Sequence, residues 1–277
     1  MSGDTELANL SAAELREFYD TERELADRLR AAPSKDARRR LYAEVYRERS
    51  ERLPSHPLVQ QAADPGARAG AIRPQAKLLE PFLGPSTVFC EIGAGDGAVA
   101  RSVATAVRRA IAFDVTDALA LPDDPTAGFE FRVFDGFDLG LVDEVDVAYS
   151  NDVAEHLHPE DMHDHALAVH RALVSGGVYV CVTPNRLSGP HDISGRFSDT
   201  PRGFHLREYT TTELAGALRA AGFRHTRVTM TVGGRRLVPP VPSGILRPVE
   251  SALERLPHPR RRRVARPLAA FKLVAEK

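Results

Sequence analysis

The 277-residue sequence lacks tryptophan and has only two cysteines, Cys90 and Cys181. Both lie inside apolar, strand-like runs, so we expect buried thiols rather than a disulfide framework or a zinc site. Lysine is also scarce, because only four of the 37 basic residues are lysines, and this bias towards arginine indicates a GC-rich bacterial genome. No stretch approaches 18 apolar residues and the first residues do not resemble a signal peptide, so a cytoplasmic protein without a transmembrane helix is expected.

The sequence has little net charge of either sign, since 37 basic residues face 38 acidic ones. Such a balance creates no general attraction to nucleic acid or to an anionic membrane. The run Arg260 to Arg263 is the exception, and it would suit RNA phosphate. A solvated connector is the simpler interpretation of this run. We expect neither a nucleic-acid nor a membrane partner, and a monomer or a homodimer.

The predicted domain organisation changes near residue 66. Residues 5–52 show helical spacing of apolar side chains, and turn-rich segments follow at 53–57 and 63–66. This pattern predicts an N-terminal helical extension or cap over residues 1–66. A single larger domain is expected over residues 67–277.

Strands and helices alternate through this larger domain, which is typical of an α/β protein with helices on both faces of a sheet. We predict a doubly wound, seven-stranded, mostly parallel sheet. The predicted strands are 87–92, 110–113, 129–134, 145–149, 178–182, 225–232 and 270–275. The predicted helices are 67–83, 97–107, 159–173, 212–221 and 243–256. The segment 184–209 has no clear periodicity, and its length favours a lid loop beside a binding site.

The strongest motif is the run EIGAGDG, which spans Glu91 to Gly97, follows a predicted strand and opens a helix. Glycines allow such a turn to bend sharply and to present backbone amides to a ligand. Three acids accompany the turn. Glu91 can orient the loop and meet an ammonium group, Asp114 ends the second strand where it can accept ribose hydroxyls, and Asp135 ends the third strand where it can accept from an adenine amino group.

Together these residues resemble the class I S-adenosylmethionine-dependent methyltransferases, over about residues 70–277. EIGAGDG is similar to the first motif of that family, IAFDV carries the ribose acid, FDG matches the adenine-side motif and LVSGGVYVCVTPN is similar to the fifth-strand signature. The resemblance implies a Rossmann-like methyltransferase fold, S-adenosylmethionine as cofactor and S-adenosylhomocysteine as product. The implied cofactor-binding residues are Glu91, Gly93, Gly95, Asp96, Gly97, Asp114, Asp135, Gly136 and Asn151.

A narrower resemblance is to bacterial small-molecule methyltransferases with Glu-His-Leu after the fourth strand, here Glu155 to Leu157. It implies methylation of oxygen or nitrogen on a small-molecule acceptor, in bacterial secondary metabolism. Candidate acceptor-binding residues are Asn185, Arg186, Asp192 and His205.

Methyl transfer to a hydroxyl or ammonium group needs a proton acceptor, and we expect His156 or His191 to supply it. Both also have structural interpretations, in which His156 packs or caps a helix and the pair of His191 and Asp192 only fixes the loop. A metal cluster of His156, His158, His163 and His165 is disfavoured because the last two point different ways on a helix, and we expect no metal. The alternatives are an NAD(P)-dependent oxidoreductase, since the glycine turn suits a dinucleotide, an RNA methyltransferase, and an inactive binding protein.

Overall fold

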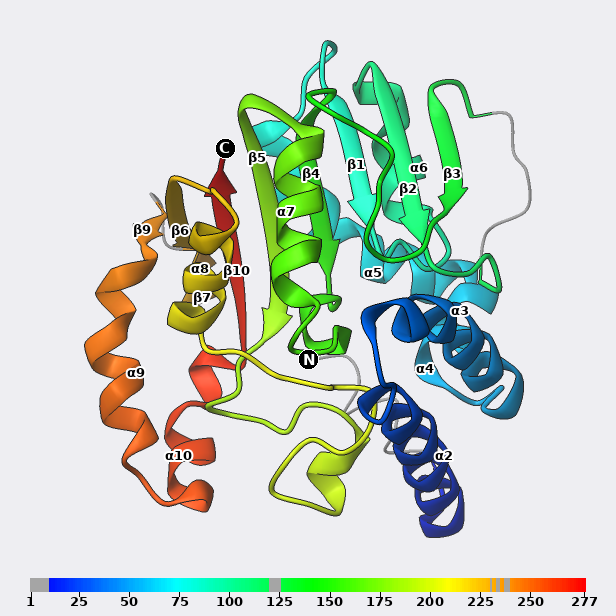
Figure 1. Cartoon of the computed structure of the whole chain (residues 1–277), viewed down its shortest axis with the longest axis vertical. Helices are drawn as coiled ribbons and strands as arrows, with labels where there is room; N and C mark the ends of the chain where they lie inside the picture. The colour runs from blue at the N-terminus through cyan, green and yellow to red at the C-terminus, as the bar shows by residue number, and fades with distance from the viewer. Residues whose placement is uncertain (1–9, 120–125, 230, 233–234, 237–239) are drawn as a thin grey trace. The chain divides into compact units, whose positions relative to one another are not determined.

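The computed structural model describes residues 10–119, 126–229, 231–232, 235–236 and 240–277 (Figure 1). The chain divides into two compact units, Met1–Gly136 and Phe137–Lys277. The boundary predicted from the sequence, after residue 66, falls inside a helix of the first unit, Pro65–Leu79, and stays a prediction. In the part of the chain described here, no helix is long and apolar enough to cross a bilayer.

The first unit begins with two paired helices, α2 (Ala12–Arg30) and α3 (Lys35–Arg52). Ser11 caps α2 through a capping box with Glu14, which satisfies backbone amides at the start of the helix. Their apolar stripes meet in a small core that contains Leu25, Leu29 and Val45. The short helix α4 (Pro57–Ala63) and then α5 (Pro65–Leu79) follow. The predicted helical extension is therefore present.

Three parallel strands form the sheet of the first unit in the order β3-β2-β1. Their bounds are Val88–Ile92 for β1, Arg109–Asp114 for β2 and Phe129–Val133 for β3. Every residue of β1 is buried, as expected for a strand covered on both faces. Helix α6 (Ala98–Val103) follows β1 directly and packs on α5. The glycine turn therefore joins the carboxyl end of β1 to the amino end of α6.

Five strands form the sheet of the second unit in the order β4-β5-β10-β6-β9. Strands β4 (Val145–Asn151) and β5 (Leu173–Pro184) are parallel, and β10 (Ala270–Glu276) lies antiparallel between β5 and β6 (His225–Thr229). Helices α7 (Met162–Ala172) and α8 (Thr211–Ala220) pack against each other and against these strands.

The prediction of seven strands was wrong, because the units together contain eight strands of the sheet among the described residues. The additional strand, β9 (Val241–Pro242), pairs with the outer strand β6. Its Val-Pro sequence carries no strand signal, since proline is tolerated only at sheet edges. The predicted strand 225–232 is also shorter than expected, because Thr231–Val232 pairs with Arg235–Arg236 in a separate hairpin.

The segment 184–209 is largely packed rather than open. It contains the short turn η5 (Ile193–Arg196), and its ends are joined by a bridge between Asn185 and Tyr209. Helices α9 (Arg247–Glu254) and α10 (His258–Val264) lie beside it through a small core of Leu187, Leu253 and Ala265. The four-arginine run belongs to the short helix α10, and three of its four side chains are exposed.

Candidate functional site

The glycine turn has the backbone geometry that its sequence predicts. Gly93, Gly95 and Gly97 all adopt positive φ angles of 68°, 57° and 74°. A Cβ at Gly97 would lie 3.2 Å from the ring of Phe131, so the turn and the sheet leave no room for a side chain. A Cβ at Gly95 would meet nothing within 4 Å. The space beside Gly95 is therefore open to a ligand that approaches the backbone.

Glu91 fixes the turn to the helix that follows it. Its buried carboxylate accepts a hydrogen bond of 2.8 Å from the backbone amide of Ala100, one of the amides left without a partner inside the first turn of α6. Burial raises the pKa of Glu91 to about 8, with smaller contributions from the negative charges of Asp96 and Asp114. A positive group beside Glu91 would stabilise its ionised form.

Asp114 lies directly against the turn. Its Oδ2 accepts a 2.7 Å hydrogen bond from the amide of Gly95, and its Oδ1 accepts one of 3.2 Å from Thr116. Burial raises the pKa of Asp114, while these backbone bonds and the charge of Arg49 on α3 act in the opposite direction. A carboxylate has about four lone-pair positions, so Asp114 retains capacity for ligand hydroxyls.

The helical extension reaches the other acids of the first unit. Arg39 Nε on α3 lies 3.4 Å from Asp135 Oδ2, and Arg68 Nε on α5 lies 3.0 Å from Asp96 Oδ2. Gly136 follows Asp135 with a φ of 86°. Eight of the nine predicted cofactor residues therefore belong to the first unit.

The ninth, Asn151, ends β4 in the second unit, where its side-chain amide donates a 2.8 Å hydrogen bond to Asp152. Asp152 itself has a φ of 55°, a left-handed conformation that is uncommon for a residue other than glycine. Its backbone amide donates to Val182 on β5 at 2.9 Å. Strained residues of this kind are held in place by their surroundings and cluster at functional sites.

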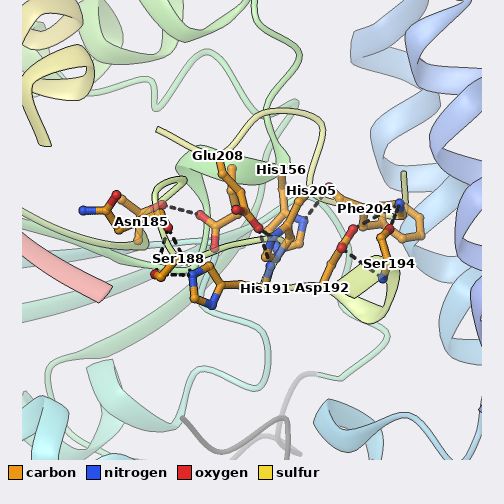
Figure 2. Close-up of polar contacts among 12 residues, drawn as sticks. His156, Asn185, Ser188, His191, Asp192, Ser194, Phe204, His205 and Glu208 are labelled. Carbon is orange, nitrogen blue, oxygen red and sulfur yellow. Dashed lines mark hydrogen bonds and ion pairs between the residues drawn. The ribbon is translucent and has the colours of Figure 1, made fainter. Parts of the chain in front are cut away.

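A histidine and carboxylate cluster follows in the second unit (Figure 2). His156 lies in the turn η4 (Ala154–His156) after β4, and its Nδ1 is 2.9 Å from the carbonyl oxygen of Phe204. The rings of His156 and His205 meet edge to face, with centroids 5.0 Å apart. His205 in turn places Nδ1 2.7 Å from Glu208 Oε1. The segment 184–209 therefore folds back onto the end of β4.

Glu208 is the carboxylate that organises this cluster. It is buried, and besides His205 it accepts a 2.6 Å hydrogen bond from the backbone amide of His191. Burial alone would raise the pKa of Glu208, but the hydrogen bond from His205 lowers it. Burial alone would lower the pKa of His205, but the bond to Glu208 raises it to about 10. The pair is therefore ionic at neutral pH.

His191 is placed differently from His205. Its Nε2 is 3.1 Å from the carbonyl oxygen of Asn185 and 2.9 Å from the hydroxyl of Ser188. Since a carbonyl only accepts, Nε2 carries the hydrogen and the lone pair is on Nδ1. The ring reaches solvent, yet the crowded loop partly desolvates it and lowers the pKa of His191. His191 is therefore a neutral imidazole near pH 7.

The remaining predicted acceptor residues have partners inside the second unit. Asp192 accepts from the backbone amides of Ser194 and Gly203, which stabilises the turn η5. The carboxylate that accepts from the backbone amide of His191 is Glu208. Arg186 forms ion pairs with Glu213 and Glu254. The role predicted for Arg186 in acceptor binding remains a prediction.

Sequence reasoning did not select Glu155, Thr183 or Glu208. The buried Glu155 accepts a 2.9 Å hydrogen bond from the hydroxyl of Thr183 on β5. Burial raises the pKa of Glu155, and the charge of Asp152 adds to this effect. Glu155 stands in the Glu-His-Leu run, so a signal was present there. Glu208 carries no local signal, because its partners lie 17 residues away and three residues away on a loop.

Comparisons with known proteins agree with this fold. A family model described as a methyltransferase domain matches residues 35–228. None of the curated proteins compared by sequence matches the chain. A chain of the complex that contains the Haloferax volcanii Trm112 methyltransferase activator has a TM-score of 0.52 and 18% identity, with 79% of this chain and 97% of that chain covered.

Two further structures contain bound S-adenosylhomocysteine. The 1,6-didemethyltoxoflavin-N1-methyltransferase of Burkholderia thailandensis has a TM-score of 0.52 and 20% identity over 85% of this chain and 88% of that chain. The Haemonchus contortus phosphoethanolamine N-methyltransferase 2 has a TM-score of 0.51 and 18% identity over 74% of this chain and 52% of that chain.

The fold is the Rossmann-like α/β fold of class I methyltransferases, whose methyl donor is S-adenosylmethionine and whose product is S-adenosylhomocysteine. Because the family model covers well over half of the sequence, the chain belongs to the methyltransferase-domain family. It is an S-adenosylmethionine-dependent methyltransferase.

Proposed function

We propose that the protein transfers a methyl group from S-adenosylmethionine to an oxygen or nitrogen of a small molecule, in bacterial secondary metabolism. The observation that carries this proposal is the cluster of buried and half-buried acids around the open glycine turn. Glu91 is the penultimate residue of β1, Asp114 is the last residue of β2 and Asp135 follows the end of β3, so all three lie at the carboxyl edge of the first unit's sheet, where α/β proteins bind ligands.

The proposed cofactor roles follow from the contacts of each acid. Glu91 would hold the turn and face the amino group of the ligand, whose positive charge would offset the burial of this carboxylate. Asp114 would accept the ribose hydroxyls, and Asp135 would accept from the adenine side. Arg39 contacts Asp135, so the helical extension would close over this part of the site.

The cofactor supplies an electrophilic methyl group, so the protein mainly has to bind, align and desolvate the acceptor. The second unit would carry the acceptor side, in the cluster of His156, His191 and His205. His191 offers a neutral imidazole with its lone pair on Nδ1, and His156 offers one with its lone pair on Nε2. Either would take the proton of a hydroxyl or ammonium acceptor.

A small-molecule acceptor is favoured over RNA by the near-neutral charge of the chain. Two proteins of similar fold are named for small-molecule substrates, a toxoflavin precursor and a phosphoethanolamine, which supports a small-molecule acceptor here. The resemblance of the Glu-His-Leu run to small-molecule methyltransferases supports the same acceptor class. The exposed arginines of α10 would support an RNA acceptor instead.

Calorimetry with S-adenosylhomocysteine, NAD and NADP tests the cofactor, and only the first is expected to bind. A second assay would follow radioactive methyl transfer from S-adenosylmethionine into hydroxylated and amino-bearing small molecules and, separately, into bulk tRNA. Label in the small-molecule fraction is expected. Label in tRNA alone would replace this proposal with an RNA methyltransferase, and binding of NAD(P) alone would replace it with an oxidoreductase.

A further inference from the structure

Glu155, His156 and His205 meet at one point although 49 positions of sequence separate the last two. One carboxylate oxygen of Glu155 and one ring nitrogen of each histidine all lie within 4.8 Å of one another, and no other such group occurs among the described residues. We propose that these three side chains form a binding site for a divalent first-row transition-metal ion. Metal binding here does not depend on the function proposed above.

The Phe204 carbonyl and the Glu208 carboxylate orient both histidine rings through Nδ1, which is how metal-binding histidines are usually held. His156 Nδ1 faces the Phe204 carbonyl, which only accepts, so Nδ1 carries the hydrogen and Nε2 carries the lone pair. His205 Nδ1 donates to Glu208 in the same way. Metal-binding histidines usually donate their second ring N–H to a carbonyl or a carboxylate, which fixes the tautomer and the ring orientation. Each histidine therefore has its supporting partner in place.

Glu155 offers the third ligand atom. Its Oε2 accepts from the hydroxyl of Thr183 at 2.9 Å, whereas no donor hydrogen-bonds to its buried Oε1 in the part of the chain that the structure describes. The carboxyl of Asp152 also lies beside Glu155. A buried polar atom without a partner is costly and requires an explanation. A cation between Oε1 and the two imidazoles would provide that partner.

The surroundings also favour a positive charge. Glu155 and Glu208 are both buried carboxylates, and each contacts or adjoins one of the two histidines. His205 already holds a positive charge through its bond to Glu208, and a metal ion at its second nitrogen would take the place of that proton. The carboxylates of Glu155 and Glu208 would offset the charge of a divalent ion.

The donor set indicates which ions fit. Two imidazoles and one carboxylate suit Zn²⁺, Co²⁺, Fe²⁺ or Mn²⁺, whereas Mg²⁺ and Ca²⁺ prefer oxygen ligands. Three protein ligands also leave at least one coordination position open, as in catalytic metal sites. If the proposed function holds, an oxygen of the acceptor is the ligand expected there, and His191 then remains as the proton acceptor.

The test uses the full chain, stripped with a chelator and titrated with Co²⁺ at pH 7.5. We expect one Co²⁺ per chain, with visible absorption bands of a nitrogen- and oxygen-ligated ion, and no binding of Mg²⁺ at the same concentrations. Glu155→Gln and His205→Asn should each lower Co²⁺ affinity by about 100-fold or more, since second-shell changes alone cost 10- to 100-fold.

His163→Gln is the matched control, because His163 is an exposed histidine near the site in sequence. It should bind Co²⁺ like the unaltered chain. Circular dichroism and S-adenosylhomocysteine binding, measured on every variant, separate loss of the metal site from loss of the fold or of the cofactor site. Absence of stoichiometric Co²⁺ binding to the unaltered chain, or full affinity in folded Glu155→Gln and His205→Asn, would overturn the proposal.

Discussion

The Glu208 carboxylate occupies the space into which a side chain at Gly189 would project. A Cβ at Gly189 would overlap Glu208 Oε2 and lie 3.0 Å from its Cδ. The carboxylate cannot turn away without breaking its hydrogen bonds to His205 and to the backbone of His191. Gly189 and Glu208 therefore depend on each other, and the histidine cluster depends on both.

Gly189→Ala should accordingly destabilise the protein by about 1–3 kcal/mol, the usual cost of overpacking a filled interior. Gly216→Ala in α8 is the control, because a Cβ there meets nothing within 4 Å and should stabilise the helix by up to about 1 kcal/mol. Urea unfolding of both variants measures the difference. Equal stabilities would show that Glu208 moves freely and does not fix the loop.

Asp114→Asn should weaken S-adenosylhomocysteine binding by about 1.5–3 kcal/mol, or roughly ten- to a hundred-fold, the range for hydrogen bonds to charged groups. The amide retains an acceptor for the Gly95 N–H, so the turn itself should persist. Asp117→Asn, three residues further along and exposed, serves as the control. Calorimetry on the folded variants decides the matter, and unchanged affinity in Asp114→Asn would remove this acid from the cofactor site.

The raised pKa of Glu91 predicts how the free energy of unfolding depends on pH in the absence of ligand. Its pKa rises from an ordinary 4.5 to about 8 in the folded chain. Between these values the folded state holds a proton that the unfolded state has lost, so the contribution of Glu91 to stability decreases as the pH rises from 4.5 to 8. Glu91→Gln stays neutral throughout and keeps an acceptor for the Ala100 amide.

The free energy of unfolding should therefore fall less steeply from pH 5.5 to pH 8.5 in Glu91→Gln than in the unaltered chain. Glu51→Gln, which changes an exposed glutamate, should leave the slope as it is. Denaturant titrations at four pH values measure these slopes. Parallel curves for Glu91→Gln and the unaltered chain would mean that Glu91 is ionised in the folded state.

His191→Asn should lower the turnover number by about 100-fold if His191 takes the acceptor's proton, because general base catalysis contributes 10²- to 10⁴-fold. Cofactor affinity should be unchanged. Because the pKa of His191 is lowered, the rate of the unaltered enzyme should fall only as the pH drops below about 6.5. His225→Asn, an exposed control, should retain full activity. A normal rate in His191→Asn would assign the histidine to the structure of the loop.

The elements that could be predicted from the sequence are each determined by residues that lie close together in it. Strand β1 is a continuous apolar run, the glycines after it require positive φ angles, and β2 ends in the acid that contacts the turn. The class of fold and the residues proposed for the cofactor could therefore be predicted. Strand β9 could not, because a Val-Pro pair becomes a strand only through pairing with β6.

The histidine cluster was only partly predictable for the same reason. His156 and His205 were selected individually, but their proximity depends on the path of segment 184–209, which local periodicity does not describe. That path is fixed by bonds such as Asp192 to Gly203 and Arg186 to Tyr209, and by the packing of α9 and α10. The sequence therefore predicted only a lid loop over this segment, and the approach of Glu155 to the two histidines was not anticipated.

Strand β10 is the last strand in the sequence, yet it lies in the interior of the second unit's sheet, between β5 and β6. Each of these strands lacks one of its two native neighbours until residues 270–276 have been synthesised. During translation both strands therefore expose unpaired edges, which favour association with other chains. Folding of the second unit is consequently an event that follows synthesis of β10, and chaperones that cover strand edges should increase its yield.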